Sequence, residues 1–217
     1  MRAIWGNWDE GKPMEFAGKF YTHTLMTPFF TPPANDYGAP KVFLAAVGPK
    51  MTEVAGEVAD GMIVHAFTTE KYLREITLPS LEKGFAKAGK SRSDFEISYP
   101  VFVCTGQTEE ELEEAKLATA QQIAFYGSTP AYKPVLDSIG VGDMQSELNT
   151  MSKQGRWVEM GELISPEIMT EFAIVGEPGQ VASQIKARYG DIVDRTSAAY
   201  ANIPKSERVK IITELSA

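Results

Sequence analysis

The chain has 217 residues, of which 43% are apolar and 23% are charged, so it can bury a sizeable hydrophobic core. Its formal charge of -8 opposes binding to nucleic acid and to anionic membrane surfaces. No apolar run approaches the roughly 20 residues that a membrane span needs, and the N-terminus does not resemble a signal peptide. These features predict a soluble, cytoplasmic protein whose partners are neither nucleic acid nor a membrane.

The residues that usually bind metals are scarce. Cys104 is the only cysteine, which excludes an internal disulfide and a cysteine-based zinc cluster. It lies in an apolar run, where a small buried side chain is more typical than a nucleophile. His23 and His65 are far apart and have no carboxylate motif beside them, so we expect no metal site.

The first 40 residues lack a core-forming pattern. Residues 11–21 place aromatic side chains around a central glycine, which is typical of a small hairpin. Proline is frequent from Pro28 to Pro40, which excludes a regular helix there and favours an extended surface segment. We therefore expect residues 1–40 to form a hairpin and a proline-rich lead-in to the core.

A strand, a helix and a second strand follow within about 25 residues, as in a compact βαβ unit. Residues 41–46 and 62–66 are continuous apolar runs, which are typical of strands covered on both faces in a parallel sheet. A turn is expected at Gly48 and Pro49. Apolar residues at helical spacing then predict one buried stripe made of Met51, Val54, Ala55, Val58 and Ala59.

The same alternation continues to the C-terminus. We expect a helix over residues 70–87, a strand over 95–104, helices beginning near 109, 166 and 178, a strand over 198–203 and a helix over 205–215. Thr108 and Glu111 have the spacing of a capping box, and Ser165 before Pro166 is a typical helix start. Residues 127–161 mix glycine and proline with short apolar runs, which predicts an irregular insertion with short helices.

The count of buried strands defines the fold class. Four are expected, near residues 42, 62, 96 and 198, and each precedes a helix. A closed parallel TIM barrel needs eight strands and about 250 residues. We therefore predict an α/β fold in which residues 41–217 form half of a TIM (β/α)8-type barrel. Open parallel edges would invite pairing with another chain, so we expect a homo-oligomer or a partner that completes the barrel.

The loop between the first buried strand and its helix has the features of an anion site. Gly48 lets the backbone approach a ligand, and Pro49 suits the first helical position. The amides of Lys50, Met51 and Thr52 are expected to be free at the helix N-terminus, where they and the helix dipole favour an anion. An ordinary tight turn would explain Gly-Pro about as well. The candidate binding residues are Ala46, Val47, Gly48, Pro49, Lys50 and Met51.

Three motifs resemble one family. Residues 43–61 resemble the strand, Gly-Pro-Lys, helix and Ala-Asp-Gly signature of luciferase-like oxidoreductases, in particular the branch that uses the deazaflavin coenzyme F-420. Residues 16–21 resemble the family's Phe-x-Gly-x-Phe-Tyr stretch, and residues 175–181 its late Val-Gly-Thr-Pro-Glu-Glu-Val element. Three motifs in the same order are much more specific than one.

This resemblance implies the C-terminal part of a TIM-like barrel that transfers hydride between coenzyme F-420, or alternatively FMN, and a small organic substrate. It also implies that residues 46–51 hold the cofactor phosphate. Residues that contact the cofactor ring and transfer the proton lie mostly on the family's early strands, which have no match here, so no catalytic residue is assigned. The alternative is a half-barrel that binds cofactor or a partner chain without turnover. A more remote alternative is a barrel enzyme that uses the loop for a substrate phosphate.

Four further residues are candidates for a substrate or cofactor pocket. His65 follows a predicted strand, where barrel enzymes place functional groups, although a histidine at the edge of the core explains it as well. Thr68 could contact a ligand or begin a helix. Tyr99 and Asn202 lie near the ends of later strands, and core packing is the simpler explanation for Tyr99.

Overall fold

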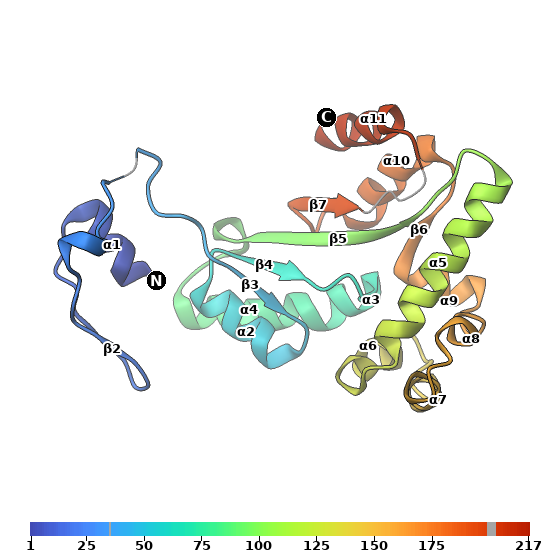
Figure 1. Ribbon diagram of the computed structural model, residues 1–217, viewed down its shortest axis with the longest axis horizontal. Coiled ribbons are helices and arrows are strands. Elements are labelled where there is room, and N and C mark those ends of the chain that lie inside the picture. Colours follow the sequence, from blue (N-terminus) through green and yellow to red (C-terminus); the bar gives the residue numbers. More distant parts are fainter. Residues whose placement is uncertain (35, 199–202) are drawn as a thin grey trace. The chain divides into compact units, whose positions relative to one another are not determined.

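The computed structural model describes residues 1–34, 36–198 and 203–217. The chain divides into two compact units, Met1–Val42 and Phe43–Ala217, each of which is described by itself. Figure 1 labels the helices and strands.

The first unit contains the predicted hairpin. Helix α1 (Arg2–Glu10) ends at Gly11, whose φ of 64° is the left-handed conformation that glycine adopts readily. Strand β1 (Phe16–Ala17) pairs antiparallel with β2 (Thr22–His23), and a 3-10 turn, η1 (Pro28–Phe30), follows. The hairpin prediction is confirmed.

The second unit is built on a five-stranded sheet in which every pairing is parallel. Its strands are β3 (Phe43–Ala46), β4 (Gly61–Val64), β5 (Glu96–Cys104), β6 (Ala173–Val175) and β7 (Arg195–Ala198). β3 pairs with β4 and β4 with β5, whereas β7 and β6 pair with successive parts of β5. The parallel α/β prediction is confirmed, and in the described residues the sheet does not close into a barrel.

Two strands differ from the sequence prediction. β6 was not predicted, because three apolar residues that directly follow a helix are too short a run to stand out from it. The last strand was expected at 198–203, but β7 begins at Arg195, where Asp194 ends a turn. Residues 199–202 of the predicted strand lie outside the described residues.

Helices alternate with these strands and fill the insertion. They are α2 (Pro49–Val58), α3 (Glu70–Tyr72), the π-helical η2 (Leu73–Thr77), α4 (Leu78–Ala88), η3 (Arg92–Asp94), α5 (Glu109–Gly127), η4 (Pro130–Tyr132), α6 (Lys133–Ser138), α7 (Met144–Lys153), α8 (Trp157–Gly161), α9 (Pro166–Phe172), α10 (Pro178–Tyr189) and α11 (Lys205–Ser216). The predicted capping box at Thr108 and the cap at Ser165 both form. None of the described helices combines the length and apolar character that a membrane crossing demands.

Two hydrophobic clusters hold the second unit together. In the first, one face of the sheet packs against α2, α4, α10 and α11 through side chains such as Met62, Ile97, Leu81 and Ile185. The second lies within α5 to α9 and includes Cys104, which is buried as predicted. Figure 1 shows α5 to α9 gathered beyond the carboxyl ends of β4 and β5.

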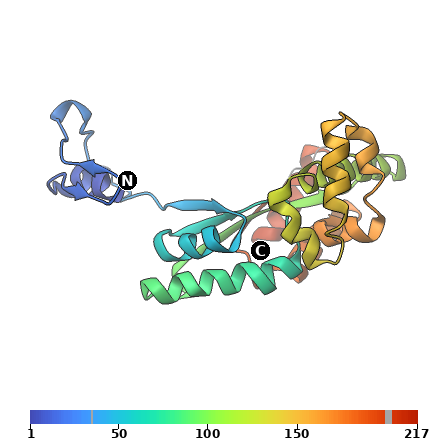
Figure 2. The same ribbon diagram turned by 90° about the horizontal axis from the view of Figure 1, so that it is seen from below.

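The predicted apolar stripe of α2 is partly wrong. Met51, Val54 and Val58 are 50%, 40% and 47% exposed, although Ala55 and Ala59 are buried as expected. The buried face instead carries Thr52 and Gly56, because α2 packs closely against α4. Figure 2 shows the two helices side by side.

Two glycines permit this close approach. A Cβ atom on Gly56 would lie 2.6 Å from the carbonyl oxygen of Leu81, and one on Gly84 would overlap the carbonyl oxygen of Glu53. The Lys87 ammonium also lies 2.5 Å from the Glu53 carboxylate across the two helices. Backbone proximity rather than side-chain periodicity therefore selects the buried face of α2.

We expect Gly84→Ala to destabilise the protein by about 1–3 kcal/mol, because the added methyl forces α2 away from α4. Gly179→Ala in α10 is the matched control, since nothing lies within 4 Å of a Cβ atom there. Urea unfolding followed by circular dichroism measures both. Equal stability of the two variants would contradict the proposed backbone contact.

Candidate functional site

The predicted anion-binding loop lies where β3 ends and α2 begins. Gly48 is the N-cap residue of α2, with extended backbone angles, and Pro49 occupies the first turn. No side chain caps this helix end. The amide of Thr52 donates to the Gly48 carbonyl oxygen over 3.1 Å. The prediction that this amide is free is therefore wrong. No such bond joins the amides of Lys50 and Met51 to other described residues, and two donors therefore remain for an anion.

The loop is open to a ligand on its outer side. A Cβ atom on Gly48 would meet nothing within 4 Å, and the side chains of Pro49, Lys50 and Met51 are exposed. Ala46 is buried, and Val47 accepts a long 3.5 Å hydrogen bond on its carbonyl oxygen from the buried Tyr72 hydroxyl. An uncapped helix N-terminus with an exposed lysine fits a phosphate group.

His65 leaves the sheet beside this loop. Ala46 and Val64 are paired across β3 and β4, so the next residues, Val47 and His65, leave neighbouring strands at the same edge. His65 Nδ1 accepts a 3.0 Å hydrogen bond from the amide of Phe67, and its Nε2 lies 3.3 Å from the hydroxyl oxygen of Tyr132. Burial lowers the pKa of His65 below its ordinary value.

Aromatic rings surround His65. Its ring centroid lies 4.9 Å from that of Tyr126, in an edge-to-face arrangement, and 4.8 Å from that of Tyr132. Neither tyrosine was predicted from the sequence as a site residue. They come from the end of α5 and from η4 in the irregular insertion, and no spacing in the sequence connects them with β4. The only signal in the sequence was that both tyrosines lie in or next to the irregular insertion.

The remaining candidates are not all brought to this edge. Thr69, rather than Thr68, begins the next helix by accepting a hydrogen bond from the amide of Tyr72. Thr68 is buried, and its hydroxyl has no partner among the described residues, as is also true of Thr105 after β5. Tyr99 is fully buried, with its hydroxyl 3.5 Å from the Thr68 carbonyl oxygen. Asn202 lies outside the described residues.

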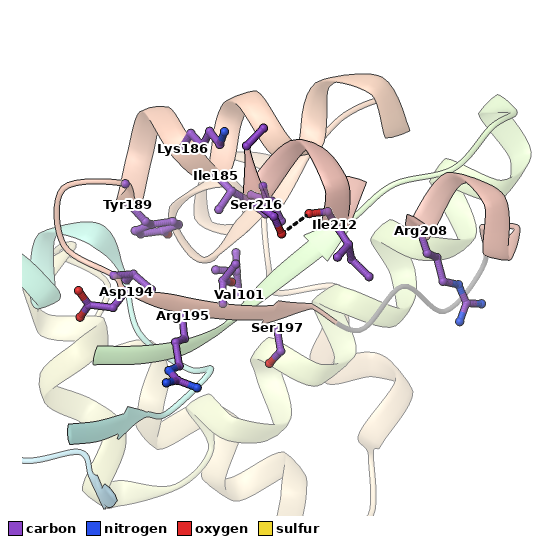
Figure 3. Close-up of a pocket in the computed structure, with 15 residues that line it drawn as sticks. Val101, Ile185, Lys186, Tyr189, Asp194, Arg195, Ser197, Arg208, Ile212 and Ser216 are labelled. Carbon is purple, nitrogen blue, oxygen red and sulfur yellow. Dashed lines mark hydrogen bonds between the residues drawn. The ribbon is translucent and has the colours of Figure 1, made fainter. Parts of the chain in front are cut away.

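A separate open pocket of about 1530 Å³ lies between β7, α10 and α11. Its apolar lining includes Val101, Ile185 and Ile212. Figure 3 shows Arg195 and Ser197 pointing to the other side of β7, away from these side chains. None of the predicted binding residues that the structure describes lines this pocket, so it does not belong to the site at the carboxyl edge.

Comparison with known proteins agrees with the fold. The family described as luciferase-like monooxygenase matches residues 1–195, and the chain therefore belongs to this family. The chain is 48% identical to the uncharacterized protein Rv1360 of Mycobacterium tuberculosis over 195 residues, which cover 90% of this chain and 57% of that protein.

More distant relatives have described activities. The chain is 25% identical over 177 residues to the 5,10-methylenetetrahydromethanopterin reductase of Archaeoglobus fulgidus, covering 81% of this chain and 51% of the relative. The structure of the coenzyme F-420-dependent tetrahydromethanopterin reductase of Methanopyrus kandleri superposes with a TM-score of 0.75 at 21% identity, covering 97% of this chain and 59% of the other. The chain spans about half the length of the curated relatives it matches.

The lowered pKa of His65 predicts a specific pH dependence of stability. The unfolded chain takes up a proton on this histidine more readily than the folded protein does. The contribution of His65 to the free energy of unfolding is therefore complete above about pH 6.5 and declines as the pH falls below that value. We expect the free energy of unfolding to fall less between pH 7.5 and 5 in His65→Gln than in the wild type. Urea titrations at the two pH values measure this difference. Identical declines would contradict it, because both proteins share the same carboxylates.

Proposed function

We propose that this chain is part of an oxidoreductase that binds coenzyme F-420 by its phosphate and transfers hydride to or from a small organic substrate. The observation that carries the proposal is the open, uncapped N-terminus of α2 at the carboxyl edge of the sheet. Membership of the luciferase-like family and the F-420 dependence of a structurally similar reductase support the choice of cofactor.

Each part of the loop has a defined task in this proposal. The amides of Lys50 and Met51 would donate hydrogen bonds to phosphate oxygens, and the Lys50 ammonium would add charge. Gly48 leaves room for the phosphate next to the backbone, and the Tyr72 hydroxyl holds the loop from the core side. Bound cofactor supplies the hydride chemistry, while the protein supplies position and electrostatics.

FMN carries a phosphate as well and is the alternative cofactor. Titration of the purified protein with oxidised F-420 and, separately, with FMN distinguishes the two, with fluorescence as the readout. We expect the tighter complex with F-420. Tighter binding of FMN would make FMN the cofactor of the same proposed site. Binding of neither molecule at high micromolar concentration would refute the proposal.

Gly48→Val tests the loop directly. The backbone angles of Gly48, φ -87° and ψ 160°, suit any residue, and no described atom lies near its Cβ position, so we expect the free energy of unfolding to change by less than about 0.5 kcal/mol. The branched side chain would occupy the space assigned to the phosphate. We expect F-420 affinity to fall by about tenfold or more, equivalent to about 1.4 kcal/mol. Unchanged affinity in a stably folded variant would refute the assigned phosphate position.

Lys50→Ala tests the charge. Removal of an exposed cation next to a phosphate is expected to weaken F-420 binding by about two- to fivefold at low salt and less at high salt. Lys153→Ala, an exposed lysine at the end of α7, is the matched control. Isothermal titration at two salt concentrations measures both variants, and equal effects of the two substitutions would argue against a specific role for Lys50.

A half-barrel that binds a partner chain without turnover is the second candidate function. It is favoured by the exposure of Ala45 and Ile63 on the sheet face opposite the helices. In the described residues β3 pairs with β4 alone, so its other edge is open. Burial of this apolar surface against a second copy would stabilise both chains.

We expect the protein to self-associate and Ile63→Glu to prevent it, because a carboxylate on the contact face would lose its hydration. Ile212→Glu on α11 is a control of similar exposure, 54% against 45% for Ile63. Sedimentation velocity between about 1 and 100 µM measures the oligomeric state. A wild type that stays monomeric throughout would contradict this prediction.

A further inference from the structure

His65 and Tyr132 form a hydrogen-bonded pair with a defined direction. The amide of Phe67 donates to His65 Nδ1 over 3.0 Å. A ring nitrogen that accepts a hydrogen bond carries no proton, so neutral His65 has its proton on Nε2. Nε2 lies 3.3 Å from the hydroxyl oxygen of Tyr132, and the Nε2–H group therefore donates to that oxygen.

This direction leaves the hydroxyl proton of Tyr132 free to donate elsewhere. Within the described part of the chain, no acceptor receives it. Protonation of His65 would break the bond from Phe67, and burial, which lowers the pKa of His65, also opposes protonation. A hydroxyl that accepts one hydrogen bond becomes a stronger donor of the next. Tyr132 is thus prepared to donate to a bound molecule.

The pair lies at the edge that carries the cofactor loop. His65 directly follows Val64, the last residue of β4, at the carboxyl edge of the sheet. The Ala46–Val64 pairing places His65 next to Val47, and neighbouring strands are only about 5 Å apart. A molecule in contact with Tyr132 would therefore lie beside a cofactor held by residues 46–51.

The rings next to the pair indicate what kind of molecule would bind. We call Tyr132, His65, Tyr126, Phe125 and Trp157 the aromatic row, because successive ring centroids lie 4.8, 4.9, 5.4 and 5.8 Å apart. Phe125 and Trp157 are 51% and 48% exposed, so ring surface is available for stacking. The nearby Lys133 is paired with Asp137 over 2.5 Å and supplies no free charge.

We infer that Tyr132 donates the hydrogen bond that orients the substrate, that His65 positions Tyr132, and that the substrate is a planar, uncharged molecule with an oxygen or nitrogen acceptor that stacks on the aromatic row. The inference deepens the proposed function and rests on it, because the bound molecule is a substrate only if the chain belongs to an oxidoreductase. The donor and the aromatic row themselves are defined without the cofactor.

The first test concerns the direction of the pair. The chain has two histidines, so the His23→Gln variant leaves a single histidine signal in long-range ¹H–¹⁵N spectra. At pH 7.5 we expect neutral His65 with its proton on Nε2, and we expect the same tautomer in Tyr132→Phe because the Phe67 amide sets it. A proton on Nδ1, or a charged ring at this pH, would overturn the inference.

The second test uses acetophenone as the probe, with ¹³C at its carbonyl. We expect saturable binding with a downfield carbonyl shift in the wild type, and about three- to tenfold weaker binding of ethylbenzene, which has no acceptor. Tyr132→Phe should remove the carbonyl shift and the difference between the two probes. His65→Gln should reduce the shift although Tyr132 remains, which a purely structural role of His65 would not produce.

The aromatic row has its own matched pair of variants. Phe125→Ala should weaken the binding of both probes, whereas Leu117→Ala, a 55% exposed residue on the same helix, should not. A carbonyl shift that survives Tyr132→Phe, or no acetophenone binding at millimolar concentration, would overturn the inference. Because these measurements need no cofactor, failure of F-420 to bind would refute the proposed function alone.

Discussion

The register between β3 and β4 is the constraint on which the candidate site depends. Backbone pairing of Ala46 with Val64 makes the two strands end together, so the candidate binding loop and His65 leave the sheet side by side. The position of the loop is further fixed by α2, whose glycine contact with α4 brings the two helix backbones together. The geometry of the site is therefore set mainly by backbone hydrogen bonds and close backbone packing, which few side-chain substitutions can shift.

The proposed phosphate site would let an acidic chain attract an anion. With a net charge of -8 the chain repels phosphate at long range. In the proposed site, two free amides, the dipole of α2 and the Lys50 ammonium would reverse this preference within a few ångströms, because local donors act at short distance whereas distant charges are screened by salt. The opposite sign of the local and the overall charge favours ligands that are held by specific contacts.

Much of this arrangement could be predicted from the sequence, because the signals were local. The runs that form β3, β4 and β5, the Gly48–Pro49 turn and the Thr108 capping box each depend on a few consecutive residues. The errors have non-local causes. The buried face of α2 is determined by its backbone contact with Gly84 in another helix. Tyr132, the hydrogen-bond partner of His65, lies in an insertion 67 residues away. No periodicity within a segment carries that information.

The π-helical segment η2 connects the two residues that hold the candidate binding loop and its helix in place, Tyr72 and Gly84. Tyr72, which holds Val47, directly precedes this segment, and Gly84, which contacts α2, lies beyond it on the continuing helix. Each residue of an α-helix turns the chain by about 100°, and a π turn contains one residue more than an α turn. Loss of a single residue here would rotate the two supports relative to each other, so they could not both face the loop and its helix. Homologous chains that keep the loop should therefore keep the number of residues in segment 73–77.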